Sequence, residues 1–243
     1  MAKSPLLVEL FEEDAEVIAS LSQKAKTAQE LKEYKSFISD YNAMIKSSVE
    51  KYWKYNEKVE YKTQSEVKKL KESKNNKYVI LPYIKQADGN MDAGFKANSG
   101  VTIPALSYSK IESSDKKPDY KICVPSSEIR KDNKYLECDF KFALIGIQAH
   151  LKWMIQNNKT VQFNEYAEIV WKDNCSKLKN TKVQVEKSFL QQKAFLQKEL
   201  TVADAKEAYG HDIEFVTAEE LSSSYTSNKK GTAVLLIIPY GTM

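Results

Sequence analysis

Tyr55–Tyr83 reads YNEKVEYKTQSEVKKLKESKNNKYVILPY, and Tyr209–Tyr240 reads YGHDIEFVTAEELSSSYTSNKKGTAVLLIIPY. Both stretches contain a short alternating apolar segment, a threonine followed three residues later by a glutamate, and an aliphatic run closed by Pro-Tyr. This pattern predicts a strand, a helix and a second strand in each stretch. We therefore interpret them as two copies of one β-α-β unit.

The start of the helix is the most sharply defined feature of both copies. Thr63 stands three residues before Glu66, and Thr217 stands three residues before Glu220. This spacing is a capping box, in which each side chain satisfies a backbone amide at the helix start. The aliphatic run that follows is typical of a parallel strand covered on both faces, and the helix supplies the crossover that parallel neighbours need.

The spacing of the remaining apolar residues extends each copy into a half of the molecule. The fold class that we predict is α/β, with two diverged Rossmann-like halves that contain the β-α-β units and have mainly parallel strands. In the first half, the first crossover is expanded into a helical insertion between Glu12 and Tyr55, with a break near Thr27. Residues 101–111 and 120–124 are expected to pair as a β-hairpin.

The duplication also predicts the domain organisation. Residues 1–131 form the first half with its helical pair and hairpin extension, 132–158 form a long connecting helix, and 159–243 form the second, shorter half. The second half ends soon after its Pro-Tyr motif, so it either lacks the hairpin extension or has been truncated.

The composition is that of a soluble globular protein, with 42% hydrophobic and 29% charged residues. The 37 basic and 33 acidic residues leave a net charge of +4, which argues against nucleic acid as the main partner. The three cysteines are odd in number and widely spaced, so they predict neither a disulfide framework nor a zinc site. No apolar run is long enough to predict a membrane span.

Motifs for catalysis and for cofactors are missing from the sequence. There is no GxGxxG or P-loop pattern, and His150 and His211 belong to no metal or triad motif. Asp88, Asn90 and Asp92 resemble the opening of a calcium loop, but the twelfth position lacks its glutamate, so an exposed loop is expected. We therefore predict no catalytic, cofactor-binding or metal-binding residue.

The equivalent positions of the two copies supply the candidate ligand-binding residues. Tyr83 and Tyr240 follow the last strand of each copy, and open α/β sheets bind ligands beyond the carboxyl ends of their strands. Glu60 and Glu214 recur at the same position of the preceding strand. These carboxylates either line a cleft between the halves or face solvent and pair with lysine.

Three functions remain open, and one of them is an anion or nucleic-acid binder that uses the lysine-rich face from Lys68 to Lys77. The first is a non-catalytic binding or structural protein, whose partner is a small molecule or another protein. The alternative is a hydrolase or transferase with a carboxylate-lined cleft between the halves, in which paired carboxyl groups carry out acid–base chemistry.

The Lys-, Asn- and Tyr-rich chain, with its strand-Pro-Tyr endings and a helix running into HLKWMIQNNK, resembles uncharacterised secreted α/β proteins of Bacteroidota. The resemblance implies an extracytoplasmic location, periplasmic or secreted, if a leader preceded the first residue. Otherwise a cytoplasmic location is expected. The resemblance carries over no activity and no site residue.

Overall fold

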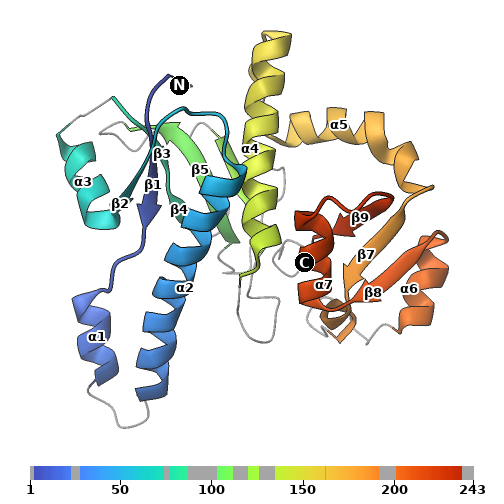
Figure 1. Ribbon diagram of the computed structural model, residues 1–243, viewed down its shortest axis with the longest axis horizontal. Coiled ribbons are helices and arrows are strands. Elements are labelled where there is room, and N and C mark those ends of the chain that lie inside the picture. Colours follow the sequence, from blue (N-terminus) through green and yellow to red (C-terminus); the bar gives the residue numbers. More distant parts are fainter. Residues whose placement is uncertain are drawn as a thin grey trace. The chain divides into compact units, whose positions relative to one another are not determined.

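The computed structural model of the chain describes residues 3–22, 28–73, 77–86, 103–111, 120–125, 135–161, 163–191 and 201–236. The protein is a mixed α/β structure with two mostly parallel sheets (Figure 1). It divides into two compact units, Met1–Tyr83 with Leu106–Lys121 and Ile84–Ala105 with Ile122–Met243. The predicted α/β class with mainly parallel strands is therefore confirmed.

The first sheet is organised around its first strand. Its strands are β1 (Leu6–Leu10), β2 (Val59–Thr63), β3 (Val79–Leu81), β4 (Tyr83–Gln86), β5 (Ile103–Lys110) and β6 (Tyr120–Cys123). β1 pairs in parallel with β2 on one side and β3 on the other, and β5 continues the sheet antiparallel to β3. The strand order is β2-β1-β3-β5-β4, and β6 pairs with β5. The two predicted hairpin segments are thus neighbours in the sheet.

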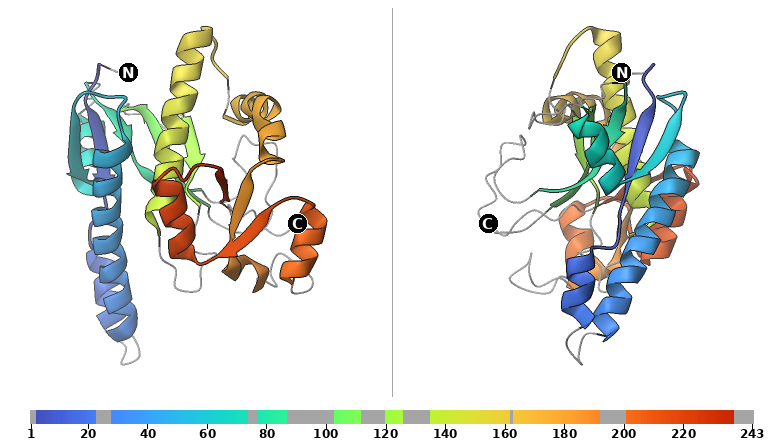
Figure 2. Two further views of the ribbon diagram at one scale, coloured as in Figure 1. Left: turned by 45° about the vertical axis from the view of Figure 1, so that its right-hand side comes forward. Right: turned by 90° about the vertical axis from the view of Figure 1, so that its left-hand side faces the viewer.

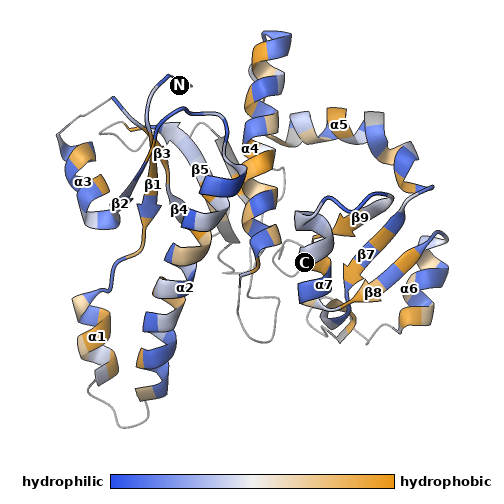
Figure 3. Cartoon of the chain, viewed as in Figure 1, coloured by the Kyte–Doolittle hydropathy of each residue, from blue (hydrophilic) through white to orange (hydrophobic). Residues whose placement is uncertain are grey.

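The helices of the first unit are α1 (Ala15–Ser22), α2 (Ala28–Tyr52) and α3 (Gln64–Glu72). The predicted helical pair is confirmed, and α1 packs alongside α2 (Figure 2). The expected break at Thr27 lies outside the described residues. Hydrophobic and polar residues alternate along α2 (Figure 3), because Ile38, Tyr41, Ile45 and Val49 recur every three or four residues on its buried side.

The second unit contains the second sheet. Its elements are α4 (Glu137–Asn157), α5 (Phe163–Leu178), β7 (Lys182–Glu186), the 3-10 helix η2 (Lys187–Gln191), α6 (Val202–Tyr209), β8 (Ile213–Val216), α7 (Ala218–Thr226) and β9 (Thr232–Leu235). The three strands are parallel, and β7 lies between β8 and β9. The long helix predicted within 132–158 is α4, which packs on α7.

Both units share one strand order, which differs from the order of a Rossmann half. In each unit the first strand lies between the second and the third, an order of 2-1-3. A Rossmann half runs 3-2-1, whereas 2-1-3 opens the other common doubly wound arrangement. The sequence pattern predicts which elements follow one another, but not the side of the first strand on which each crossover ends.

The predicted capping boxes are present in both units. Thr63 accepts a hydrogen bond from the Glu66 amide, and the Glu66 carboxylate accepts one from the Thr63 amide. Thr217 and Glu220 form the same reciprocal pair, with distances of 3.2 and 2.9 Å. Each box ends an edge strand and starts the helix that crosses to the third strand, so it fixes where the chain turns back over the sheet.

Each unit has its own hydrophobic core. In the first, Leu7, Ile80 and Ile111 are buried together, with Leu70 of α3 packed against them. In the second, the buried residues are Cys138, Val216 and Leu221, packed against partly buried hydrophobics that include Leu136 and Val234. The sheet of each unit is therefore covered by the helix that its capping box starts.

α4 is also tied to α7 by a buried lysine. The Nζ of Lys141 donates to the carbonyl oxygens of Tyr225 and Thr226 and to the side chain of Asn228. These groups lie at the C-terminal end of α7, where the helix dipole favours a cation.

Replacing Thr63 or Thr217 with alanine removes the oxygen that caps α3 or α7, and each change should lower the free energy of unfolding by about 1 kcal/mol. Urea denaturation of both variants measures the loss. Thr63→Ser and Thr217→Ser keep the hydroxyl and should remain close to the wild type. Equal losses in the serine and alanine variants would show that the threonine methyl group, rather than the cap, is responsible.

Candidate functional site

The predicted carboxylates occupy equivalent places in the two units. Glu60 is the second residue of β2, and Glu214 is the second residue of β8. The Lys58 ammonium lies 2.8 Å from Glu60. Glu214 accepts a hydrogen bond from the Gln184 amide at 2.9 Å, and the Lys182 ammonium lies 3.9 Å away. Each carboxylate is thus satisfied within its own unit.

These contacts lower the pKa of both carboxyl groups. The hydrogen bond from Lys58 lowers the pKa of Glu60, and the hydrogen bond from Gln184, with the charge of Lys182, lowers the pKa of Glu214. A carboxyl group that acts as a general acid near neutral pH needs a raised pKa. Neither residue meets that requirement, and a cleft shared between the halves stays a prediction.

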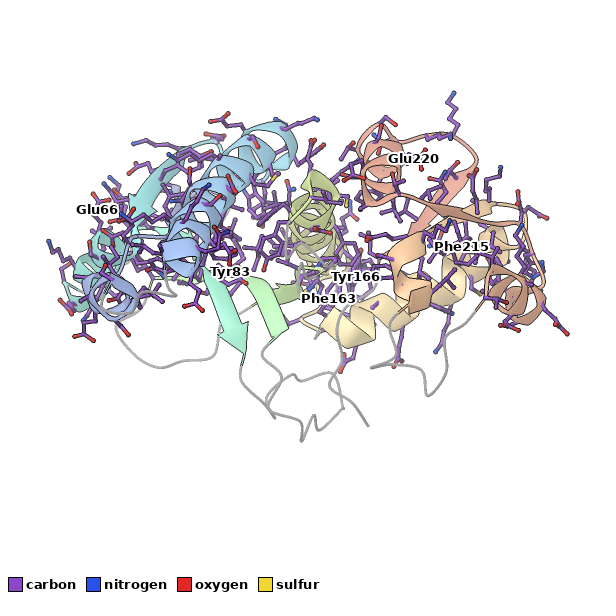
Figure 4. The ribbon with its side chains drawn as sticks, turned by 90° about the horizontal axis from the view of Figure 1, so that it is seen from below. Glu66, Tyr83, Phe163, Tyr166, Phe215 and Glu220 are labelled. Atoms are coloured by element: carbon purple, nitrogen blue, oxygen red, sulfur yellow. The ribbon has the colours of Figure 1, made fainter. Side chains whose placement is uncertain are left out.

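Tyr83 is held in an aromatic cluster just beyond β3. Its ring meets those of Phe11 and Tyr41 edge-on, with centroid distances of 5.2 Å in both cases (Figure 4). The Asn42 side chain fixes Phe11 by accepting from its backbone amide at 2.9 Å and donating to its carbonyl at 3.0 Å. Tyr83 is half-buried and serves packing at this edge of the sheet. Tyr240 and the calcium-like residues Asp88, Asn90 and Asp92 lie outside the described residues.

The helix start beside this edge is occupied by a carboxylate of the chain itself. Both Glu12 oxygens bind Ser65, one accepting from the backbone amide at 2.6 Å and the other from the hydroxyl at 2.9 Å. The hydrogen bond from the Ser65 amide lowers the pKa of Glu12. A helix N-terminus is a ready anion site. In this unit, Glu12 takes the place that the phosphate of a ligand would need.

Glu9 differs from Glu12 in its environment, because the pKa of Glu9 is raised whereas that of Glu12 is lowered. Glu9 is two residues after Leu7 in β1, so both side chains face the side of the strand that α3 covers. Burial raises its pKa, and the charge of Lys71 and a hydrogen bond from Gln64 oppose that rise. Sequence reasoning missed this residue, although a single glutamate inside the apolar run of Leu6–Leu10 was a visible signal.

His150 is a packing residue of the second unit. It is buried on α4, its ring stacks on Tyr166 at 4.9 Å, and Phe163 of α5 meets it at 5.7 Å (Figure 4). Its Nε2 donates to the Val161 carbonyl at 3.0 Å, since a carbonyl oxygen can only accept. Burial lowers the pKa of His150, so the neutral ring is favoured. The ring joins α4 to α5.

A pocket of about 390 Å³ lies beside β8 in the second unit. It is lined by Lys182, Lys187, Val202, Lys206, Asp212, Ile213, Glu214 and Phe215. The three lysines come from β7, η2 and α6, and the apolar residues come from α6 and β8. Sequence reasoning missed the site because these lysines are spread along the chain, and only the fold brings them together.

Lys182 is neutralised by Glu214, whereas Lys187 and Lys206 form no ion pair within the described part of the chain. The pocket lining thus combines apolar side chains, two lysines without an ion pair in the described chain, and the carboxylate of Asp212. Such a site suits a ligand that carries both apolar groups and a carboxylate or phosphate.

No cluster of metal-binding side chains occurs among the described residues, and none of the described helices is long and apolar enough to cross a membrane. Comparison with protein-family models, curated proteins and solved structures gives no match. The resemblance to secreted Bacteroidota proteins therefore stays a prediction.

Glu9→Gln should increase the free energy of unfolding at pH 7, because the pKa of Glu9 is raised in the folded state. The stability that this residue contributes is present below its ordinary value of 4.5 and is lost as the pH rises. Urea denaturation at pH 4 and pH 7 measures the difference between variant and wild type, which should be larger at pH 7.

Glu12→Gln is the matched control, because the pKa of Glu12 is lowered and its contribution is present above 4.5 and lost as the pH falls. This variant should be less stable than the wild type at pH 7 and approach it in acid. If both variants changed with pH in the same direction, the assigned environments would be wrong.

Proposed function

We propose that the protein is a non-catalytic binding protein whose ligand occupies the pocket beside β8. The observation that carries the proposal is the presence of three lysines beside apolar residues in the lining of that pocket. The ligand class is an anion with apolar substituents, bearing carboxylate or phosphate groups. Lys187 and Lys206 supply the charge, and Val202, Ile213 and Phe215 supply the apolar contact.

The state of the acidic residues supports a binding role over catalysis. The pKa values of Glu60 and Glu214 are both lowered, so neither is set up as a proton donor. The His150 ring is packed against Tyr166 and donates to a backbone carbonyl. Glu60, Glu214 and His150 thus serve ion pairs, hydrogen bonds and packing.

One observation favours the alternative of a hydrolase or transferase. Glu9 and Glu12 follow one another on and just after β1, and their pKa values are displaced in opposite directions, as in acid–base pairs. Both Glu12 oxygens are, however, engaged by Ser65. The pair therefore supports the start of α3, and we rank catalysis second.

The same proposal includes the origin of the two units as diverged copies. The shared strand order, the matched capping boxes and the equivalent positions of Glu60 and Glu214 support it. A duplicated scaffold lets one copy keep a structural role while the other acquires a ligand.

Isothermal titration with citrate, inorganic phosphate and a capped glutamate-rich peptide tests the binding site. The double variant Lys187→Gln/Lys206→Gln should bind the preferred anion at least about tenfold more weakly, because it loses two charge-assisted contacts. The affinity of the wild type should also fall with added salt.

The matched control is Lys159→Gln/Lys172→Gln, which removes the same charge from exposed positions outside the pocket. An equal loss in the control would mean that general surface charge, rather than the pocket, attracts the anion. Absence of binding to every probe would remove the proposal.

A further inference from the structure

β8 is an edge strand of the second sheet. The strand order is β8-β7-β9, and no described strand pairs with β8 on the side away from β7. The edge of a sheet presents backbone donors and acceptors that can pair with another extended chain. The pocket beside β8 therefore borders a surface with hydrogen-bonding capacity beyond its side chains.

The register of β7 and β8 identifies the backbone groups that point outward. Val183 lies opposite Ile213, and the Val183 amide donates to the Asp212 carbonyl at 2.9 Å. In a parallel ladder, successive residues direct their N–H and C=O groups to opposite sides. The backbone N–H and C=O groups of Asp212 and Glu214 thus point toward β7. Those of Ile213 and Phe215 point toward the open edge.

The pocket extends along this same edge. Its lining includes consecutive residues from Asp212 to Phe215. Side chains of neighbouring strand residues project to opposite faces, so Glu214 and Phe215 lie on different faces of the sheet. The lining of the pocket therefore includes residues whose side chains belong to both faces of this edge strand.

Charge complementarity selects the occupant. Lys182, Lys187 and Lys206 bring three positive charges to the lining and Asp212 and Glu214 bring two negative charges, so the pocket keeps one net positive charge; Lys187 and Lys206 form no ion pair in the described chain. An extended peptide with alternating acidic and apolar residues would place its carboxylates near the lysines and its apolar side chains against Val202 and Phe215.

A second copy of the chain suits the edge less well. β8 of a second copy also alternates acidic and apolar residues from Asp212 to Phe215, but that copy would bring its own Lys187 and Lys206 to the same edge, where like charges repel.

We infer that the outer edge of β8 binds an extended acidic segment of a partner protein as an added strand. The inference rests on the proposed function, since the added strand occupies the same pocket. Backbone pairing with Ile213 and Phe215 supplies the affinity that is common to all such peptides, and the lysines supply the preference for acidic sequences.

An N-methyl scan of the ligand tests the backbone contacts without changing the protein. The probe is a fluorescein-labelled, capped octapeptide of alternating glutamate and valine, titrated into the full chain by fluorescence anisotropy. Methylation at every second amide should weaken binding by roughly five- to tenfold, and methylation at the intervening amides by much less. This period of two is the signature of strand addition.

The outcomes separate the inference from the function on which it rests. Binding of citrate without binding of the peptide, or peptide binding that is insensitive to methylation, would overturn strand addition and leave an anion-binding pocket. Absence of binding to citrate, phosphate and peptide alike would remove both.

Ile213→Pro tests the same contact from the side of the protein. Proline removes the outward N–H of the first residue of an edge strand, a position where it is tolerated, and the Asp212 carbonyl that accepts from Val183 remains. The ratio of peptide affinity to citrate affinity should fall by roughly five- to tenfold. Ile213→Val keeps the N–H and should leave that ratio closer to the wild-type value.

If Ile213→Pro does not fold, the N-methyl scan decides alone. Size-exclusion chromatography with light scattering is run beside both experiments. A concentration-dependent dimer that the peptide dissociates would overturn the inference in favour of pairing between two copies.

Discussion

The two-sided pairing of β1 and of β7 is the constraint on which the rest of the structure depends. A parallel strand with neighbours on both sides has no edge, and helices can cover both of its faces. Leu6, Leu7 and Val8 are accordingly 0% exposed, and Val183 and Val185 are buried in β7. Because the first strand takes the centre, the second strand of each unit becomes the edge. The position of the candidate site beside β8 follows from that order.

The helix that crosses back over the central strand imposes a second requirement. Its first amides have no intrahelical partner, and the capping boxes of Thr63 and Thr217 satisfy only part of them. In the first unit, Glu12 satisfies the amide of Ser65 as well. This contact stabilises the start of α3 and also closes the anion site that many doubly wound proteins offer to a ligand. At the carboxyl edge of the first sheet, the start of α3 is therefore already occupied by a side chain of the same unit.

Local patterns allowed much of this fold to be predicted, because caps and apolar periodicities are encoded by neighbouring residues. The boxes at Thr63 and Thr217 and the helical pair before β2 belong to this class. The strand order was not predictable, since no residue records on which side of β1 a crossover ends. The same limit applies to the pocket, where Lys182, Lys187 and Lys206 meet only after β7 and β8 have paired. Of the predicted site residues that the structure describes, Tyr83 lies in an aromatic cluster and Glu214 lines the pocket.

The two edge strands explain why only one unit is expected to hold a ligand. On β2, Glu60 pairs with Lys58 and Glu66 pairs with Lys62, so the basic residues of that edge are neutralised locally. Tyr61 adds a contact with α2 by donating its hydroxyl to the Lys46 carbonyl at 3.4 Å. Beside β8, the lysines are contributed by η2 and α6, and Lys187 and Lys206 keep their charge available in the described chain. Equivalent backbone edges thus differ in electrostatics, and that difference selects an acidic partner for the second unit.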